Sequence, residues 1–156
     1  TFKGPIVARW LYDDRFERRY LDLDILVDPA HFPQARLVLQ ECGFTDVQAG
    51  VRDREVAPHA RDFLRGSSSV DLHRHIPGLD VLGDQAAFEV LIERSEQVMF
   101  PSGPLVAPDQ AAGALIAAAT VISSVGGNLQ PLVDLDRVVD RLSAPDWADV
   151  VALASS

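Results

Sequence analysis

Apolar and polar residues alternate with a period of two in two short segments of the first half of the chain. This pattern predicts β-strands over residues 20–27 and 70–76. A weaker alternation predicts a further strand within residues 44–57. Residues 58–69 are polar, and Gly66-Ser-Ser-Ser69 at their end predicts a loop. The expected strands therefore all lie in the first half.

Apolar residues spaced three and four positions apart predict helices along the whole chain. The expected helices cover residues 5–12, 30–42, 85–97, 108–125, 131–142 and 147–154. Pro5 suits a first helical turn, and Gly43 suits a helix end. We therefore expect an α+β protein with a small mixed β-sheet flanked by helices. Residues 1–78 would form this α/β core, and residues 79–156 a C-terminal helical subdomain.

Composition narrows the possible partners. The 156 residues are 47% hydrophobic, enough for a buried core, and carry a formal net charge of -9. Such an acidic chain is not expected to bind extended nucleic acid, which requires a basic surface. Residues 1–75 hold 11 of the 14 Lys and Arg residues, so an anionic small substrate could be attracted there, although ordinary surface charge explains the count equally well. A single cysteine, Cys42, excludes an internal disulfide and favours a cytoplasmic setting.

One segment is long enough to span a membrane. Gln110–Val133 is uncharged over 24 residues. Because Gly126-Gly127-Asn128 and Pro131 interrupt it, we interpret it as buried helix and expect no membrane association. The chain begins with Thr1 inside an expected strand, so we expect a fragment of a longer protein.

Two carboxylates, Asp22 and Asp24, stand one residue apart inside the apolar strand of residues 20–27. On a strand they project to the same face, while Leu21, Leu23 and the following alternate residues face a core. Like charges held so close repel each other unless a cation or water separates them. The spacing therefore predicts a divalent metal site.

Other polar residues can complete such a site. Asp71 lies on the second clear strand, and a neighbouring position would bring it beside the aspartate pair. Three converging carboxylates suit two-metal phosphoryl transfer. Gly4 precedes an expected helix and would let the backbone approach a phosphate. Arg19 either binds phosphate or forms a plain salt bridge.

His73 shares the face of Asp71. It is expected to contact phosphate, to orient a carboxylate, or to serve the structure only. His75 lies on the same face, so a transition-metal pair with His73 is a further alternative.

Together these segments resemble an uncharacterised bacterial nucleotidyltransferase-like family of the polymerase-β-type nucleotidyltransferase superfamily. The resemblance extends over nearly the whole chain. It rests on Lys3-Gly4, Leu11-Tyr12, Arg19-x-x-Asp22-x-Asp24-x-Leu26-Val27, Val70-Asp71-Leu72-His73, Leu132-Val133-Asp134-Leu135-Asp136 and Asp146-Trp147.

The resemblance implies which residues bind metal and which bind the nucleotide. Asp22, Asp24 and Asp71 would be catalytic metal ligands for Mg²⁺ or Mn²⁺, and Asp71 could also act as base. Gly4 would form the nucleotide-phosphate turn. Lys3-Gly4-Pro5 departs from the superfamily's Gly-Gly or Gly-Ser, so Lys3 would supply a phosphate contact instead.

Three functions follow as hypotheses. The first is transfer of a nucleotide from a nucleoside triphosphate (NTP), with ATP expected, to a small-molecule or protein hydroxyl. The second is a catalytically degenerate nucleotide-binding module, suggested by the altered turn. The third is an antitoxin-like interaction protein that uses the helix over residues 108–125 to bind a partner or form a homodimer.

Overall fold

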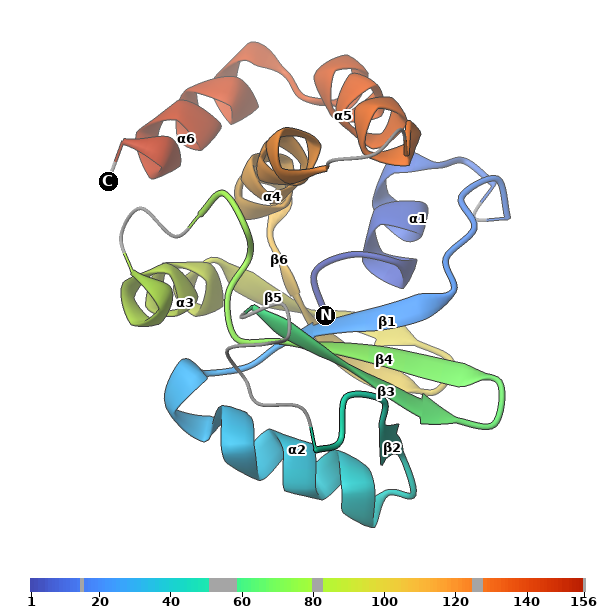
Figure 1. The fold of residues 1–156 in the computed structure, drawn as a ribbon. Coiled ribbons are helices and arrows are strands. Elements are labelled where there is room, and N and C mark those ends of the chain that lie inside the picture. Colours follow the sequence, from blue (N-terminus) through green and yellow to red (C-terminus); the bar gives the residue numbers. More distant parts are fainter. Residues whose placement is uncertain (15, 51–58, 80–82, 125–127, 156) are drawn as a thin grey trace.

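The computed structural model describes residues 1–14, 16–50, 59–79, 83–124 and 128–155. Its centre is a sheet with the strand order β1-β4-β3-β2 (Figure 1). These strands are β1 (Asp22–Leu26), β2 (Thr45–Asp46), β3 (Ala60–Arg65) and β4 (Ser68–His73). Strand β1 runs parallel to β4, whereas the other pairs are antiparallel. The predicted α+β class with a small mixed sheet is confirmed.

One face of the sheet is apolar. Helix α2 (Phe32–Glu41), which follows the short helix η1 (Pro29–His31), lies on this side (Figure 1). Phe63 of β3, which is 0% exposed, packs there with Val70 and Leu72 of β4. Because side chains alternate along a strand, the residues between these point to the opposite face. That opposite face carries the acidic residues of β1 and β4.

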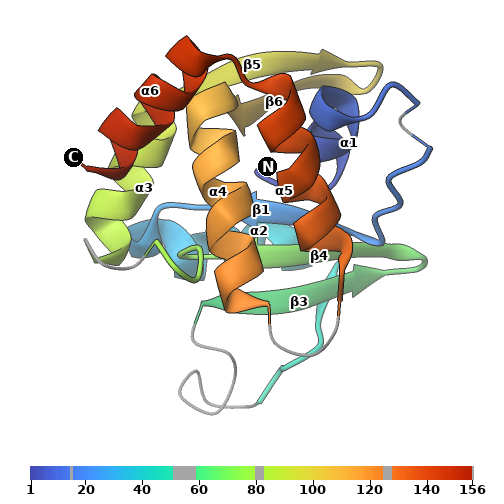
Figure 2. The same cartoon turned by 90° about the horizontal axis from the view of Figure 1, so that it is seen from above.

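Helices cover the opposite side of the molecule (Figure 1). They are α1 (Pro5–Leu11), α4 (Gln110–Ser123), α5 (Gln130–Arg141) and α6 (Ala144–Ala154), whereas α3 (Asp84–Glu93) lies beside one end of the sheet (Figure 1). Helix α4 lies between α5 and α6, as the view from above shows (Figure 2). It begins at Asp109, whose side chain accepts a hydrogen bond of 2.9 Å from the amide of Ala112. Leu11 of α1, Val138 of α5 and Val150 of α6 share one core.

Helix α1 approaches α4 closely at Gly113. A Cβ atom at this position would lie 3.0 Å from Cζ3 of Trp10. Such a contact is tighter than almost any real Cβ contact, so a residue with a side chain at position 113 would require the indole ring to shift. The uncharged segment Gln110–Val133, predicted to be buried helix, contains α4. No helix among the described residues is both long enough and apolar enough to cross a membrane. The division of the chain at residue 78 stays a prediction.

Strands occur where the sequence predicted none. Residues 60–65, a polar stretch for which no strand was predicted, form β3, and β4 begins at Ser68 within the predicted loop of residues 66–69. The expected helix over residues 85–97 ends at Glu93, and a hairpin of β5 (Ser95–Phe100) and β6 (Gly103–Pro108) follows. Of the expected strand over residues 44–57, the structure contains only β2, and residues 51–58 lie outside the described part.

Candidate active site

The carboxylates of Asp24 and Asp71 come together across two neighbouring strands. The parallel pairing of β1 with β4 sets the Cα atom of Asp24 opposite that of Asp71. Residues opposite each other in a ladder point to the same face. Asp24 is buried, with 7% of its surface exposed, whereas Asp71 is half-buried. The proximity expected from the sequence for these two residues is confirmed.

His73 reaches both carboxylates from the end of β4. Its Nε2 atom lies 3.2 Å from Oδ1 of Asp24 and 3.0 Å from Oδ2 of Asp71. The three residues offer ligand atoms that all lie within 4.8 Å of one another, and they form the one such group among the described residues. His75 is not part of it; its Nδ1 lies 3.3 Å from Asp84 instead.

Electrostatics favours charged forms in this group. Burial alone would lower the pKa of His73, but its contacts with Asp24 and Asp71 outweigh burial and raise it. Burial alone would raise the pKa of Asp24, yet His73 and Lys3 together hold it below the usual value. The Nζ atom of Lys3 lies 3.7 Å from Oδ1 of Asp24. The positively charged side chains of His73 and Lys3 therefore both lie beside the carboxylate of Asp24.

Asp22 stands two residues before Asp24 on β1 and is more exposed. Partial burial raises the pKa of Asp22, and the repulsion from Asp24 adds to this. Its carboxylate lines the same cavity as Asp24 and Asp71. The side chain of Leu21, predicted to face the core, is 90% exposed, because β1 begins only at Asp22.

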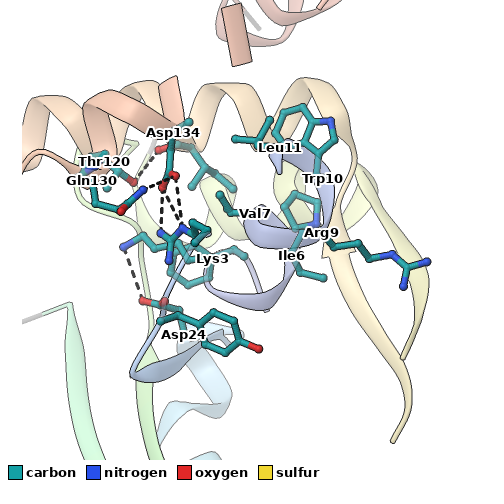
Figure 3. A pocket seen from close by; sticks show the side chains of 18 of the residues that line it. Lys3, Ile6, Val7, Arg9, Trp10, Leu11, Asp24, Thr120, Gln130 and Asp134 are labelled. Atoms are coloured by element: carbon teal, nitrogen blue, oxygen red, sulfur yellow. Dashed lines mark hydrogen bonds and ion pairs between the residues drawn. The ribbon is translucent and has the colours of Figure 1, made fainter. Parts of the chain in front are cut away.

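A cavity of about 1100 Å³ opens above the acidic face of the sheet. Its lining includes Asp24 and Lys3 on one side and Gln130 and Asp134 of α5 on the other (Figure 3). Trp10 of α1 contributes an apolar wall. A volume of this size suits a small-molecule ligand rather than a single ion.

Two residues predicted to bind phosphate occupy different surroundings. Gly4 has φ 54°, a backbone conformation that favours glycine, and a Cβ there would lie 3.3 Å from the carbonyl oxygen of Asp22. It packs against β1 and is not among the residues that line the cavity. Arg19 does line the cavity and is exposed. Within the described part of the chain, its backbone carbonyl accepts a hydrogen bond from Arg18.

A polar network on the α5 side was missed by the sequence analysis. Asp134, which is 6% exposed, accepts hydrogen bonds from the Tyr12 hydroxyl at 2.6 Å, from Gln130 Nε2 at 3.0 Å and from Arg18 Nη2 at 2.9 Å. The signal in the sequence is an aspartate four residues before Val138, on the stripe of α5 that faces the core.

The network has a consequence for stability at high pH. Burial, followed by the hydrogen bond to Asp134, raises the pKa of Tyr12 to about 12. Arg137, above its ring, and Gln130 act in the opposite direction. Because the pKa of Tyr12 is higher in the folded chain than in the unfolded chain, the protonated hydroxyl stabilises the fold. This contribution is fully present below pH 10 and is lost as the pH rises through 12.

We expect the stability advantage of the native chain over Tyr12→Phe to fall by about 2 kcal/mol between pH 9 and pH 12. Urea unfolding at several pH values measures it, with Tyr20→Phe, at a residue that is 48% exposed, as the matched control. An advantage of Tyr12 that does not change with pH would contradict the prediction.

The donor set near His73 fits a divalent cation. Oδ1 of Asp71 and Nδ1 of His73 are buried and have no hydrogen-bond partner among the described residues, whereas Nε2 of His73 forms ion pairs with both carboxylates. Carboxylate oxygens suit Mg²⁺ and Mn²⁺, and an imidazole nitrogen is a common ligand of transition metals. Buried polar atoms without partners, next to two carboxylates, are typical of a site that holds an ion.

A mixed sheet with acidic residues at neighbouring strands, facing a cavity closed by helices, defines an α+β protein of the nucleotidyltransferase-like class. A family profile described as "Uncharacterised nucleotidyltransferase" matches residues 1–156. The chain therefore belongs to this family, and nucleotidyl transfer is the general kind of activity that the match supports. No curated protein matches the chain.

Proposed function

We propose that this chain transfers a nucleoside monophosphate from an NTP, with ATP as the first candidate, to a hydroxyl group of a small molecule or protein. A divalent cation, Mg²⁺ or Mn²⁺, would assist. One observation carries the proposal: Asp24, Asp71 and His73 converge beside a cavity in a member of a nucleotidyltransferase family. The size of the cavity supports a ligand as large as a nucleotide.

In this proposal Asp22, Asp24 and Asp71 hold the cation. When bound, the cation would neutralise phosphate charge and polarise the reacting phosphoryl group. His73 orients the carboxylates of Asp24 and Asp71, since its Nε2 lies within 3.2 Å of both. Asp71 would also act as the general base that accepts the proton of the acceptor hydroxyl.

Two cationic side chains on the cavity wall suit the phosphates. Lys3 and Arg19 both line the cavity. Phosphate groups form charge-assisted hydrogen bonds with such side chains. The reaction would then depend mainly on positioning and charge neutralisation, with the acceptor oxygen attacking the α-phosphorus in line with the departing pyrophosphate.

The test is pyrophosphate release from each of the four common ribonucleoside triphosphates, with Mg²⁺ or Mn²⁺ and a panel of small-molecule and protein acceptors. We expect release with at least one pair and none when EDTA removes the metal. A protein that binds Mn²⁺ but neither binds nor turns over any triphosphate would contradict the proposal. Nucleotide addition is confirmed separately by the mass of the product.

A second candidate is a nucleotide-binding or antitoxin-like interaction module that performs no transfer. It is supported by the position of Gly4, which packs against Asp22 and Tyr20 rather than lining the cavity. This function predicts nucleotide binding without pyrophosphate release across the same panel. Turnover by the purified chain would exclude it.

A further inference from the structure

A buried ion pair joins the loop before β1 to helix α5. Arg18 presents Nε and Nη2 to the carboxylate of Asp134, with 2.9 Å between Nη2 and Oδ2. The side chains of Arg18 and Asp134 are only 13% and 9% exposed. Tyr12 and Gln130 donate to the same carboxylate, so Asp134 is held in place from three directions.

This pair lies on the wall of the cavity that contains the acidic cluster. Arg18 and Asp134 line that cavity together with Lys3, Asp24 and Asp71. Figure 3 shows Asp24 and Asp134 on opposite sides, with Lys3 near Asp24. The positive charge of Arg18 is one of those that lower the pKa of Asp24, so the two side chains are within electrostatic range.

Stabilisation of the fold does not by itself explain why Arg18 and Asp134 form a buried ion pair. Removing two charges from water costs nearly as much as their attraction returns, so a buried ion pair contributes little net stability. What the pair does provide is a guanidinium with a fixed orientation. Its plane is set by the two-point contact with Asp134, and Nη1 donates to the carbonyl oxygen of Arg19 at 3.2 Å.

A guanidinium has five N–H groups. The contacts within the described residues use one at Nε and one at each Nη atom, which leaves further N–H groups at Nη1 and Nη2. Lys3, in contrast, already interacts with Asp24. A triphosphate beside the acidic cluster carries several charged oxygens, so a further cation along the cavity, in addition to Lys3 and Arg19, has phosphate groups to bind, and Arg18 is already oriented for that role.

We propose that Arg18, oriented by Asp134, binds the triphosphate tail of the nucleotide, and that α5 thereby forms part of the nucleotide site. The proposal rests on the proposed function. Arg18 is assigned the phosphate contact, and Asp134 is a positioning residue that acts through it. The cavity would then select triphosphates over monophosphates, because a monophosphate lacks the β- and γ-phosphates that Arg18 is assigned to bind.

The experiment measures the affinities of the full chain for ATP and AMP by calorimetry in the presence of Mn²⁺. Arg18→Gln is expected to weaken ATP binding about 10-fold to 100-fold, as expected for lost hydrogen bonds to a charged group, and to leave AMP and Mn²⁺ binding nearly unchanged. Arg141→Gln is the matched control, because Arg141 also pairs with an aspartate, Asp13, at 2.7 Å but is exposed and is not among the residues that line the cavity. It should keep the ATP-to-AMP preference.

A cycle with Asp134→Asn separates positioning from folding. Asp134→Asn alone should weaken ATP binding, yet it should have little further effect in the Arg18→Gln background, because it acts through the same guanidinium. The double variant also removes both buried charges at nearly constant volume, so it keeps the test valid if either single variant unfolds. Thermal unfolding of each variant verifies that it is folded.

The outcomes are distinct. A native chain that releases pyrophosphate, with a folded Arg18→Gln that keeps the native ATP-to-AMP preference, overturns this inference and leaves the proposed function intact. A native chain that binds Mn²⁺ but no nucleotide overturns both. A loss of thermal stability without a change in the preference means that the ion pair has only a structural role.

Discussion

Asp24→Asn and Asp71→Asn are each expected to weaken Mn²⁺ binding by at least about 100-fold, because even groups one step removed from a metal change its affinity by about 10-fold to 100-fold. Each substitution keeps the size of the side chain and removes one negative charge. A cation between two carboxylates depends on both charges, since their mutual repulsion is what its binding relieves. Pyrophosphate release should fall at least as far.

Electron paramagnetic resonance of Mn²⁺ measures this binding directly. The matched control is Asp62→Asn, because Asp62 lies opposite Asp71 in the pairing of β3 with β4 and is an exposed neighbour on the same face. Its carboxylate accepts a hydrogen bond of 2.7 Å from Gln48 and lies outside the Asp24, Asp71 and His73 group. If Asp71→Asn binds Mn²⁺ as well as the native chain does, the proposed site is wrong.

The second large effect concerns the core beneath this site. Phe63→Ala is expected to lower the free energy of unfolding by about 3–5 kcal/mol, because it removes a fully buried aromatic ring and leaves a cavity. The loss is large compared with the total stability of a typical domain, about 5–15 kcal/mol. Phe63 pairs with Val70, the residue before Asp71, so the ring supports the strand that carries the site.

Urea unfolding at neutral pH measures the change. Leu64→Ala is the control on the same strand, since Leu64 points to the other face and is 46% exposed. Its substitution should cost less than about 1 kcal/mol, as expected for a half-exposed surface position. Equal losses for the two variants would contradict the packing of β3 against α2.

The alternation of apolar and polar residues was sufficient to predict the two strands that carry the aspartates. Asp22-x-Asp24 lies on a strand, and Asp71 stands beside Asp24 on the neighbouring strand, because alternation marks the buried face of each strand unambiguously. The polar segment at residues 58–69 misled the prediction for a physical reason. Arg61 is buried on the apolar side of β3, where it contacts Asp46 at 3.3 Å, so a charged residue occupies a core position.

The hairpin of β5 and β6 was missed because its strand residues, apart from the buried Ala107, are exposed or half-buried. Such strands show little apolar alternation, and Pro104 and Pro108 in β6 suggest a break rather than a strand. The Arg18–Asp134 pair was missed for another reason. The two residues are 116 positions apart in sequence, and no local spacing links a loop arginine to a helix in the last third of the chain.

The contact of Gly113 with Trp10 allows the shape of the cavity to be varied independently of its charge. Both residues line the cavity, and the indole ring occupies the space that a side chain on α4 would take. A larger residue at position 113 would displace the ring without altering any acidic or basic group. The range of ligands that fit the cavity would thus change through this one apolar contact.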